Sequence, residues 1–338
     1  MNSPADYYGF FDASPEAEDA EIRSSYRAAF IGAVILLVLV PLAAAVVTKT
    51  KIDFTPTLVA PEGTLMSWVA HNESDRKTFL IGDYALTLSS REKQSGERVA
   101  VLNVKASNGE EITVHGQLGY PIPSADFGVG RFDPHNRTSQ VIFTTYSGGT
   151  HCCTKITVLE LAHDRWHKID LGTWDGDPLA EFPEDVDGDG VSEIVLKDDR
   201  FDYAFAPYSE TYKPPRIVAI RKGRAVDVSH SARYDKLYEA DMNIAYAGCM
   251  EHKNAACAAF VADASRLGRW SWAWNIMKAN YHRSKDWDFP TKCTVPLVKD
   301  ACPPGRSEQF REFPDALEWF LTDKGYVNRR SPGEATRR

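Results

Sequence analysis

The stretch that decides the fold is Arg98-Val-Ala-Val-Leu-Asn-Val-Lys105, followed by Ser107-Asn-Gly109 and Glu111-Ile-Thr-Val-His115. Apolar and β-branched residues dominate both runs, and the short segment between them has the residue types of a tight turn. Further apolar runs of this kind lie at 140–146, 155–161 and 194–197. Short strands separated by turns predict antiparallel sheet across 53–232, as a sandwich or as part of a propeller.

The residue pattern changes after position 232. Ala, Leu, Met and Glu at helical spacing predict helices at 234–250 and 254–267, and a further helix is expected at 314–324. Between them, 269–281 has three tryptophans spaced by two, as in a strand, among residues that favour a helix. The fold class we expect is α+β, with a small disulfide-containing helical domain at 233–328 and a disordered tail at 329–338.

An uncharged apolar run extends from Ala28 to Thr48. About 20 such residues are enough for a helix to cross a bilayer, so the run predicts a transmembrane signal-anchor at 28–48 behind a tail at 1–27. A cleaved signal peptide is the alternative, because Ala43-Ala-Ala45 fits the small-residue cleavage pattern. The long acidic leader before the run is not typical of a signal peptide.

The cysteines indicate which side of the membrane the folded part occupies. Basic residues flank the apolar run equally and give no orientation. All six cysteines follow the run, and an even set on one side indicates an oxidising compartment. We therefore expect the N-terminal tail in the cytoplasm and the rest outside it, in the periplasm or at the cell surface. A formal net charge of -8 gives no support for nucleic-acid binding.

The strongest chemical signal is Asp185-Val-Asp-Gly-Asp-Gly-Val-Ser-Glu193. Calcium takes six to eight hard oxygen ligands, and alternate carboxylates in a tightly curled loop point to one centre. The sequence predicts a calcium site whose ligands are Asp185, Asp187, Asp189, the carbonyl of Val191, and Glu193. The alternative is an acidic glycine turn closed by hydrogen bonds from its own backbone.

This loop resembles the calcium loop of FG-GAP or VCBS-type repeats, the integrin-like propeller family. Segments 127–143 and 182–196 both run from an aromatic residue through a polar loop into an apolar strand, like two copies of such a repeat. The first copy has His135 and Arg137 where carboxylates belong, so the resemblance implies calcium in the second copy alone. It also implies adhesion, scaffolding or ligand binding rather than catalysis.

Ser147-Gly-Gly-Thr-His-Cys-Cys153 is the most unusual string. His151 with Cys152 or Cys153 would make a base and a nucleophile, although neighbours on a strand point to opposite faces. A vicinal disulfide and ordinary structural bridges are the alternatives. For the other four cysteines the simplest of three connectivities is local pairing, Cys249 with Cys257 and Cys293 with Cys302.

These patterns predict a membrane-anchored, extracytoplasmic binding or interaction module that has a structural calcium site and takes a protein or glycan ligand. The alternative is an extracytoplasmic enzyme, a hydrolase or a thiol-redox protein, that uses His151 with Cys152 or Cys153.

Overall fold

The computed structural model describes residues 57–72, 75–93, 96–119, 122–149, 152–176, 178–179, 181–283, 287–299 and 301–327. The predicted tail and signal-anchor at 1–48, and the C-terminal tail from 329, lie outside these residues. Within the described ranges, no helix is long and apolar enough to cross a membrane. All described residues belong to one compact unit, Phe54–Arg338.

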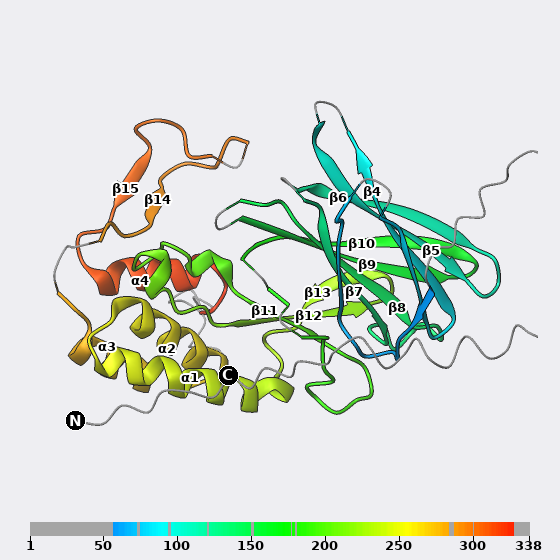
Figure 1. The fold of residues 1–338 in the computed structure, drawn as a ribbon. Helices are drawn as coiled ribbons and strands as arrows, with labels where there is room; N and C mark the ends of the chain where they lie inside the picture. Colours follow the sequence, from blue (N-terminus) through cyan, green and yellow to red (C-terminus); the bar gives the residue numbers. More distant parts are fainter. Residues whose placement is uncertain are drawn as a thin grey trace, which may run out of the picture. The chain divides into compact units, whose positions relative to one another are not determined.

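The first layer of the fold is a five-stranded sheet in the order β1-β3-β4-β5-β6 (Figure 1). Its strands are β1 (Thr57–Val59), β3 (Lys77–Ile81), β4 (Tyr84–Glu92), β5 (Arg98–Ala106) and β6 (Glu111–Gly119). β1 is parallel to β3, and the other neighbours are antiparallel. The predicted turn before β6 is confirmed, and Gly109 there has a φ of 94°, which suits glycine alone.

The second layer is a fully antiparallel sheet in the order β10-β9-β8-β7-β2. Its strands are β2 (Met66–Val69), β7 (Ser124–Gly130), β8 (Gln140–Tyr146), β9 (Cys152–Ala162) and β10 (Arg165–Asp175). A third, smaller antiparallel sheet contains β11 (Ile194–Lys197), β12 (Pro215–Arg221) and β13 (Arg224–Asp227).

Strand β8 shows how these sheets stack. It is buried at every position except Tyr146. Val141 and Phe143 pack into the apolar core that the second sheet shares with the first, whereas Ile142 packs into a separate core shared with the third sheet. Because successive strand residues point to opposite faces, the second sheet must be covered on both sides. The predicted antiparallel sheet is therefore confirmed, and its first two layers form a sandwich.

The described residues of the C-terminal part contain four helices, the three predicted ones and one at the ambiguous segment 269–281. They are α1 (Asp235–Met250), α2 (Asn254–Arg266), α3 (Trp270–Asn280) and α4 (Phe313–Asp323). The alanine-rich α2 is buried from Ala255 to Ala264, in contact with each of the other three helices. Gly268, with a φ of 70°, follows α2 as the sequence predicts. The ambiguous tryptophan segment is a helix, not a strand.

The sheets and the helices share side-chain contacts. Ile217 of β12 packs against Tyr234 and Tyr238, and the Tyr238 hydroxyl donates to the carbonyl of Pro215 at 3.2 Å. From the segment between β11 and β12, Phe205 enters the helical core and lies 5.2 Å from Phe320, ring centre to ring centre. The division into separate domains at 53–232 and 233–328 stays a prediction.

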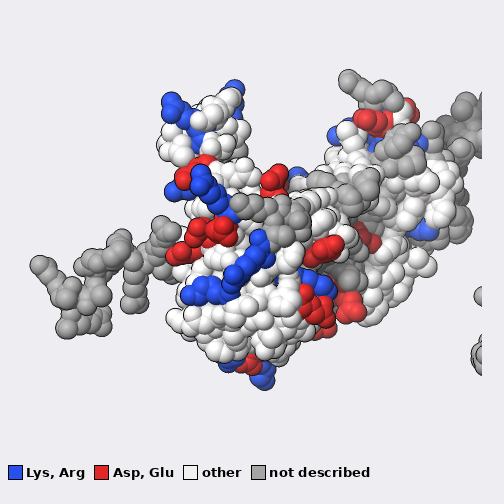
Figure 2. Space-filling model, turned by 90° about the vertical axis from the view of Figure 1, so that its left-hand side faces the viewer, with Lys and Arg blue, Asp and Glu red and all other residues white. Residues whose placement is uncertain are grey.

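A two-stranded ribbon extends from the helical part. Its strands are β14 (Thr291–Cys293) and β15 (Ser307–Gln309). On the face in Figure 2, basic and acidic side chains are interspersed, so neither sign of charge dominates there.

Candidate functional site

The acidic loop lies between β10 and β11 and curls around one carboxylate. Asp185 accepts hydrogen bonds from three backbone N–H groups, those of Gly188 at 2.8 Å, Asp189 at 3.0 Å and Gly190 at 2.7 Å. Gly188 and Gly190 have φ values of 78° and 84°, which side chains resist. The residue types thus produce the tight curl without help from a distant segment.

Three carboxylates converge inside this curl. Asp185, Asp187 and Glu193 each offer an oxygen, and these oxygens lie within 4.8 Å of one another. Calcium–oxygen bonds are about 2.3–2.6 Å long, so ligands of one ion stand no more than about 5 Å apart. Within the described residues, this is the group of acidic, histidine and cysteine side chains that meets that spacing.

Glu193 supplies the most informative atom of the loop. The residue is fully buried; its Oε2 accepts from the Val186 N–H at 3.1 Å, while its Oε1 has no hydrogen-bond partner. A buried carboxylate oxygen without a partner is costly and requires an explanation. Burial raises the pKa of Glu193, and the negative charges of Asp187 and Asp189 add to that rise. A cation between these groups would satisfy the oxygen, so the residues fit calcium.

The other two predicted ligands are placed differently. Asp189 lies outside the three-carboxylate group, and its Oδ1 accepts from the Val191 N–H at 3.0 Å. The side chain of Val191 is buried in the loop. Direct ligation by Asp189 and by the Val191 carbonyl stays a prediction.

The structure adds arginines that the sequence pattern did not reveal. Arg233 Nη1 lies 3.0 Å from Asp187 Oδ2 and 3.7 Å from Asp189 Oδ2, although Arg233 is 46 positions further along the chain than Asp187. Arg221 Nη2 is 3.8 Å from Glu193 Oε1, beyond hydrogen-bond distance. Arg233 stands just before α1, so it connects the loop to the first helix.

The two repeat-like copies contact each other. Phe182, at the start of the second copy, packs on Gly128 and Gly130 of the first; a Cβ at either glycine would lie 2.5 Å from its nearest neighbour, and the Phe182 ring presses on both positions. The Ser192 N–H donates to the carbonyl of Arg131 at 2.8 Å. The glycines of the first copy therefore allow the close approach of the second.

The loop of the first copy follows β7. Its Asp133 is buried and lies 3.1 Å from the ring Nδ1 of the exposed His135, which lines a cavity together with the exposed Arg137. The difference in chemistry between the two loops thus follows the difference in sequence.

The cysteines pair locally in the helical part. Cys249 is bonded to Cys257, and Cys293 to Cys302, as predicted. Cys153 is also disulfide-bonded, and its N–H donates to the Ser147 hydroxyl at 2.7 Å. His151 and the side chain of Cys152 lie outside the described residues. The vicinal bridge therefore stays a prediction.

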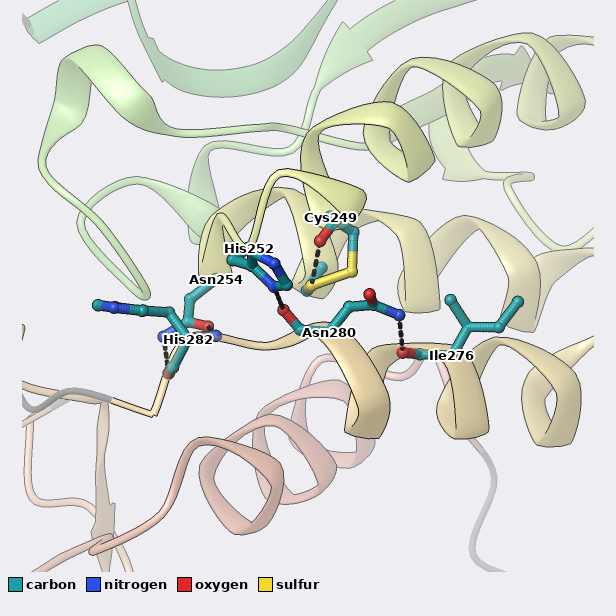
Figure 3. Close-up of a disulfide and its surroundings, with 7 residues drawn as sticks. Cys249, His252, Asn254, Ile276, Asn280 and His282 are labelled. Carbon is teal, nitrogen blue, oxygen red and sulfur yellow. Dashed lines mark hydrogen bonds between the residues drawn. A yellow bond between two sulfur atoms is a disulfide. The ribbon is translucent and has the colours of Figure 1, made fainter.

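Figure 3 shows how the turn between α1 and α2 is fastened beside its disulfide. His252, with a φ of 63°, places Nδ1 2.6 Å from the carbonyl oxygen of Asn280, which makes Nδ1 the protonated nitrogen because a carbonyl only accepts. The side chain of Asn254 accepts from the N–H of His282 at 2.9 Å and donates to its carbonyl at 3.1 Å. These groups attach the turn to the end of α3 and act structurally.

The tryptophans of α3 make contacts with other aromatic side chains. These contacts are more consistent with a packing role than with a surface on which a sugar ring stacks. Trp270 and Trp274 stack on each other at 4.7 Å and pack against the helical core. Trp272 is 48% exposed and meets the buried Phe260 edge-on at 5.4 Å.

The fold and the loop define a class of protein: stacked antiparallel sheets, a disulfide-bonded helical C-terminal part, and an acidic loop beside the first helix. One comparison with known protein families covers the helical part. A family model described as the sll0997 C-terminal domain matches residues 232–325, which contain all four helices and begin one residue before Arg233.

Two relatives match a larger part of the chain. The probable thylakoid lumen protein sll0997 of Synechocystis sp. is 31% identical over 265 residues, which are 75% of this chain and 76% of that protein. The uncharacterized protein y4bJ of Sinorhizobium fredii is 33% identical over 195 residues, 56% of this chain and 30% of that longer protein. The chain belongs to the family of the sll0997 protein. No solved structure matches it.

Proposed function

We propose that this protein is a membrane-anchored, extracytoplasmic binding module whose loop at 185–193 holds one structural calcium ion. The observation that carries the calcium site is the buried side chain of Glu193, whose Oε1 has no hydrogen-bond partner and which offers an oxygen within 4.8 Å of oxygens of Asp185 and Asp187. The resemblance of the loop to FG-GAP or VCBS-type repeats supports the same function.

Each residue has a distinct part in this proposal. Asp185 organises the loop through its three backbone hydrogen bonds and offers an oxygen to the ion. The side chain of Asp187 is 1% exposed, and Glu193 is fully buried, so their charges repel each other. Arg233 beside Asp187 and Arg221 3.8 Å from Glu193 offset that repulsion in part. Calcium supplies further positive charge when bound, and the closed loop then remains in place between the second sheet and the first helix.

Two observations support the extracytoplasmic location. Within the described residues no cysteine is free, as is typical of an oxidising compartment. The name of the relative in Synechocystis sp. refers to the thylakoid lumen, which is separated from the cytoplasm by a membrane. The anchor at 28–48 is supported by its apolar sequence. A topology reporter fused after Arg338 should be active outside the cytoplasm only; activity inside it would overturn the orientation.

The enzyme alternative receives less support. A bonded Cys153 has no thiolate that can attack a substrate. A thiol-redox role for the Ser147–Cys153 segment stays open to test by titrating thiols in the native, unreduced protein.

Thermal unfolding of the full chain tests the calcium site. At a calcium concentration one hundred times the dissociation constant, we expect about 2.7 kcal/mol of stabilisation over a chelated sample. Glu193→Gln and Asp187→Ala should both abolish that gain. Glu184→Gln is the matched control, because Glu184 is exposed in the same loop and belongs to no carboxylate group. A gain that survives in Glu193→Gln would place the ion elsewhere.

A further inference from the structure

A cavity of about 740 Å³ lies where the loop of the first copy meets two hairpin turns. The loop at 133–138 forms one wall, the β9–β10 turn at His163-Asp164 a second, and the β12–β13 turn at Lys222-Gly223 a third. Its size is within the range of about 300–1,000 Å³ that is usual for sites of small ligands. The cavity shares no residue with the proposed calcium site.

The floor of the cavity is a pair of buried carboxyl groups. Asp133 and Glu160 are 1% and 3% exposed. Asp133 accepts from the Gly223 N–H at 3.0 Å and from the His135 N–H at 2.9 Å, and the side chain of Asn136 donates to Glu160 Oε1 at 3.1 Å. A Cβ on Gly223 would lie 2.9 Å from Glu160 Oε2, so glycine is what lets the turn close over this oxygen.

The two carboxyl groups differ in their preference for a proton. Burial raises the pKa of Glu160, and the nearby Asp133 adds to the rise. Burial acts in the same direction on Asp133, but hydrogen bonds from the backbone of His135 and Gly223 outweigh it and lower the pKa. Carboxyl oxygens are hydrogen-bond acceptors, which suits the hydroxyl groups of a ligand.

The rim of the cavity is basic. Arg137, Lys222 and Arg224 line it as exposed cations, together with three exposed histidines, His135, His163 and His167, and one exposed carboxylate, Asp164. His163 and Lys222 have φ values of 52° and 53°, in a region that residues other than glycine seldom occupy. Both residues lie in two-residue hairpin turns, between β9 and β10 and between β12 and β13, where a positive φ is the usual geometry.

We propose that this cavity binds a saccharide that carries an anionic group. Its hydroxyl groups would bond to Asp133 and Glu160 on the floor, and its anionic group would pair with Arg137, Lys222 and Arg224 at the rim. The proposal gives the binding module of the preceding section a ligand site, and it rests on that proposed function only in this respect.

Three other ligand classes fit the cavity less well. An inorganic anion could use the rim but would be repelled by the floor. A cationic ligand would be repelled by the rim for the same reason. A bare metal ion lacks a donor set, since within the described residues the group of acidic, histidine and cysteine side chains with close ligand atoms is in the loop at 185–193.

Binding to the full chain, measured by calorimetry, tests the proposal. The probes are a glucuronate-containing disaccharide, a neutral glucose disaccharide and inorganic sulfate. We expect the acidic disaccharide to bind at least about 10-fold more tightly than the other two, because it alone matches both the floor and the rim. No binding of the acidic disaccharide at about 10 mM, or equal binding of sulfate, would overturn the proposal.

Two variants test the contributions of the floor and the rim of the cavity separately. Glu160→Gln keeps an acceptor for Asn136 but removes the ionisable group, and the double variant Arg137→Ala, Lys222→Ala changes only exposed side chains; each should weaken binding about 10-fold. Lys168→Ala is the matched control, because Lys168 is an exposed cation of β10 that does not line the cavity. Wild-type affinity in the exposed double variant would contradict the proposed rim.

The calcium variant distinguishes this proposal from the preceding one. Glu193→Gln should lose the stabilisation by calcium and keep saccharide binding, since the two sites share no residue. Saccharide binding by a protein that takes up no calcium would leave the cavity proposal intact and remove the calcium proposal. Stabilisation by calcium without saccharide binding would leave the calcium proposal intact and remove the cavity proposal.

Discussion

The loops of the two repeat-like copies share one feature, an aspartate that accepts backbone hydrogen bonds, and differ in their surroundings. This aspartate is Asp133 in the first copy and Asp185 in the second. Around Asp185 two more carboxylates converge, with one exposed arginine beside them. Around Asp133 the neighbours are one buried carboxyl group, histidines and cations. The backbone of a loop and the chemistry of its site are thus determined by different residues.

The two loops also differ in where their hydrogen bonds come from. All three N–H groups bonded to Asp185 are in its own loop, and the residue is exposed. Asp133 is buried and receives one bond from Gly223, 90 positions away on another hairpin. Asp133 of the first loop therefore holds two distant segments together, whereas Asp185 bonds only within its own loop and is exposed to solvent.

The largest expected effect comes from replacing each aspartate with alanine. Asp133→Ala leaves buried N–H groups without an acceptor and should lower the free energy of unfolding by about 3 kcal/mol. Asp185→Ala removes bonds that water can replace, so in chelated protein it should cost less than about 1 kcal/mol. Denaturant unfolding of both variants measures the difference. Equal losses would mean that the two loops have the same structural role.

The pH dependence of stability gives a second, smaller effect. The folded-state pKa of Glu193 is raised above its ordinary value of 4.5, chiefly by burial. Between that value and the folded pKa the native protein binds more protons than the unfolded chain, so the stability of chelated protein falls as pH rises through this window. Glu193→Gln removes this contribution, and the curve of the variant should fall less steeply.

Two matched measurements sharpen the pH comparison. Glu160→Gln in the first copy should flatten the curve in the same way, because burial raises the pKa of Glu160 as well. Asp263, buried in α2 with a raised pKa, contributes equally to wild type and variants and cancels in the difference. With calcium present the trend reverses in wild type and in Glu160→Gln but not in Glu193→Gln, since the ion requires an ionised Glu193. If the free energy of unfolding of chelated wild type and of chelated Glu193→Gln changed equally with pH, the result would contradict a buried ionisable group at position 193.

The smallest effect concerns the arginine at the second loop. Arg233 is a resident cation that competes with calcium for Asp187. Because it is largely exposed, its interaction is screened, and Arg233→Gln should raise calcium affinity only about twofold to fivefold. Arg269→Gln is a suitable control, since this exposed arginine pairs with Glu239, away from the loop. An unchanged or weaker calcium affinity would show that Arg233 supports the loop instead of competing.

Local features of this structure could be predicted from the sequence. The strand and helix periods, the turn at Asn108-Gly109 and the helix end at Gly268 all depend on residues a few positions apart. The two disulfides in the helical part follow from proximity in the chain. The curl around Asp185 does too, because the N–H groups that it accepts from belong to residues 188–190.

Features made by distant residues could not be predicted. Arg233 reaches the loop only after β11, β12 and β13 have formed the third sheet, and no spacing in the sequence encodes that approach. The cavity over Asp133 requires three turns to meet, one of them 90 positions away. The one local indication of this cavity in the sequence was that His135 and Arg137 stand where the acidic pattern has carboxylates. A departure from a motif was therefore the best available marker of a second site.

Calorimetric titration of the chelated full chain with calcium tests the central claim most directly. The account predicts one ion per chain, bound at about 10⁻⁴–10⁻³ M as in other extracellular modules, and no uptake by Glu193→Gln. Magnesium should bind poorly, because it demands a tighter octahedral shell. No heat of calcium binding at millimolar concentration would contradict the account: the loop at 185–193 would then be an acidic turn closed by its own hydrogen bonds.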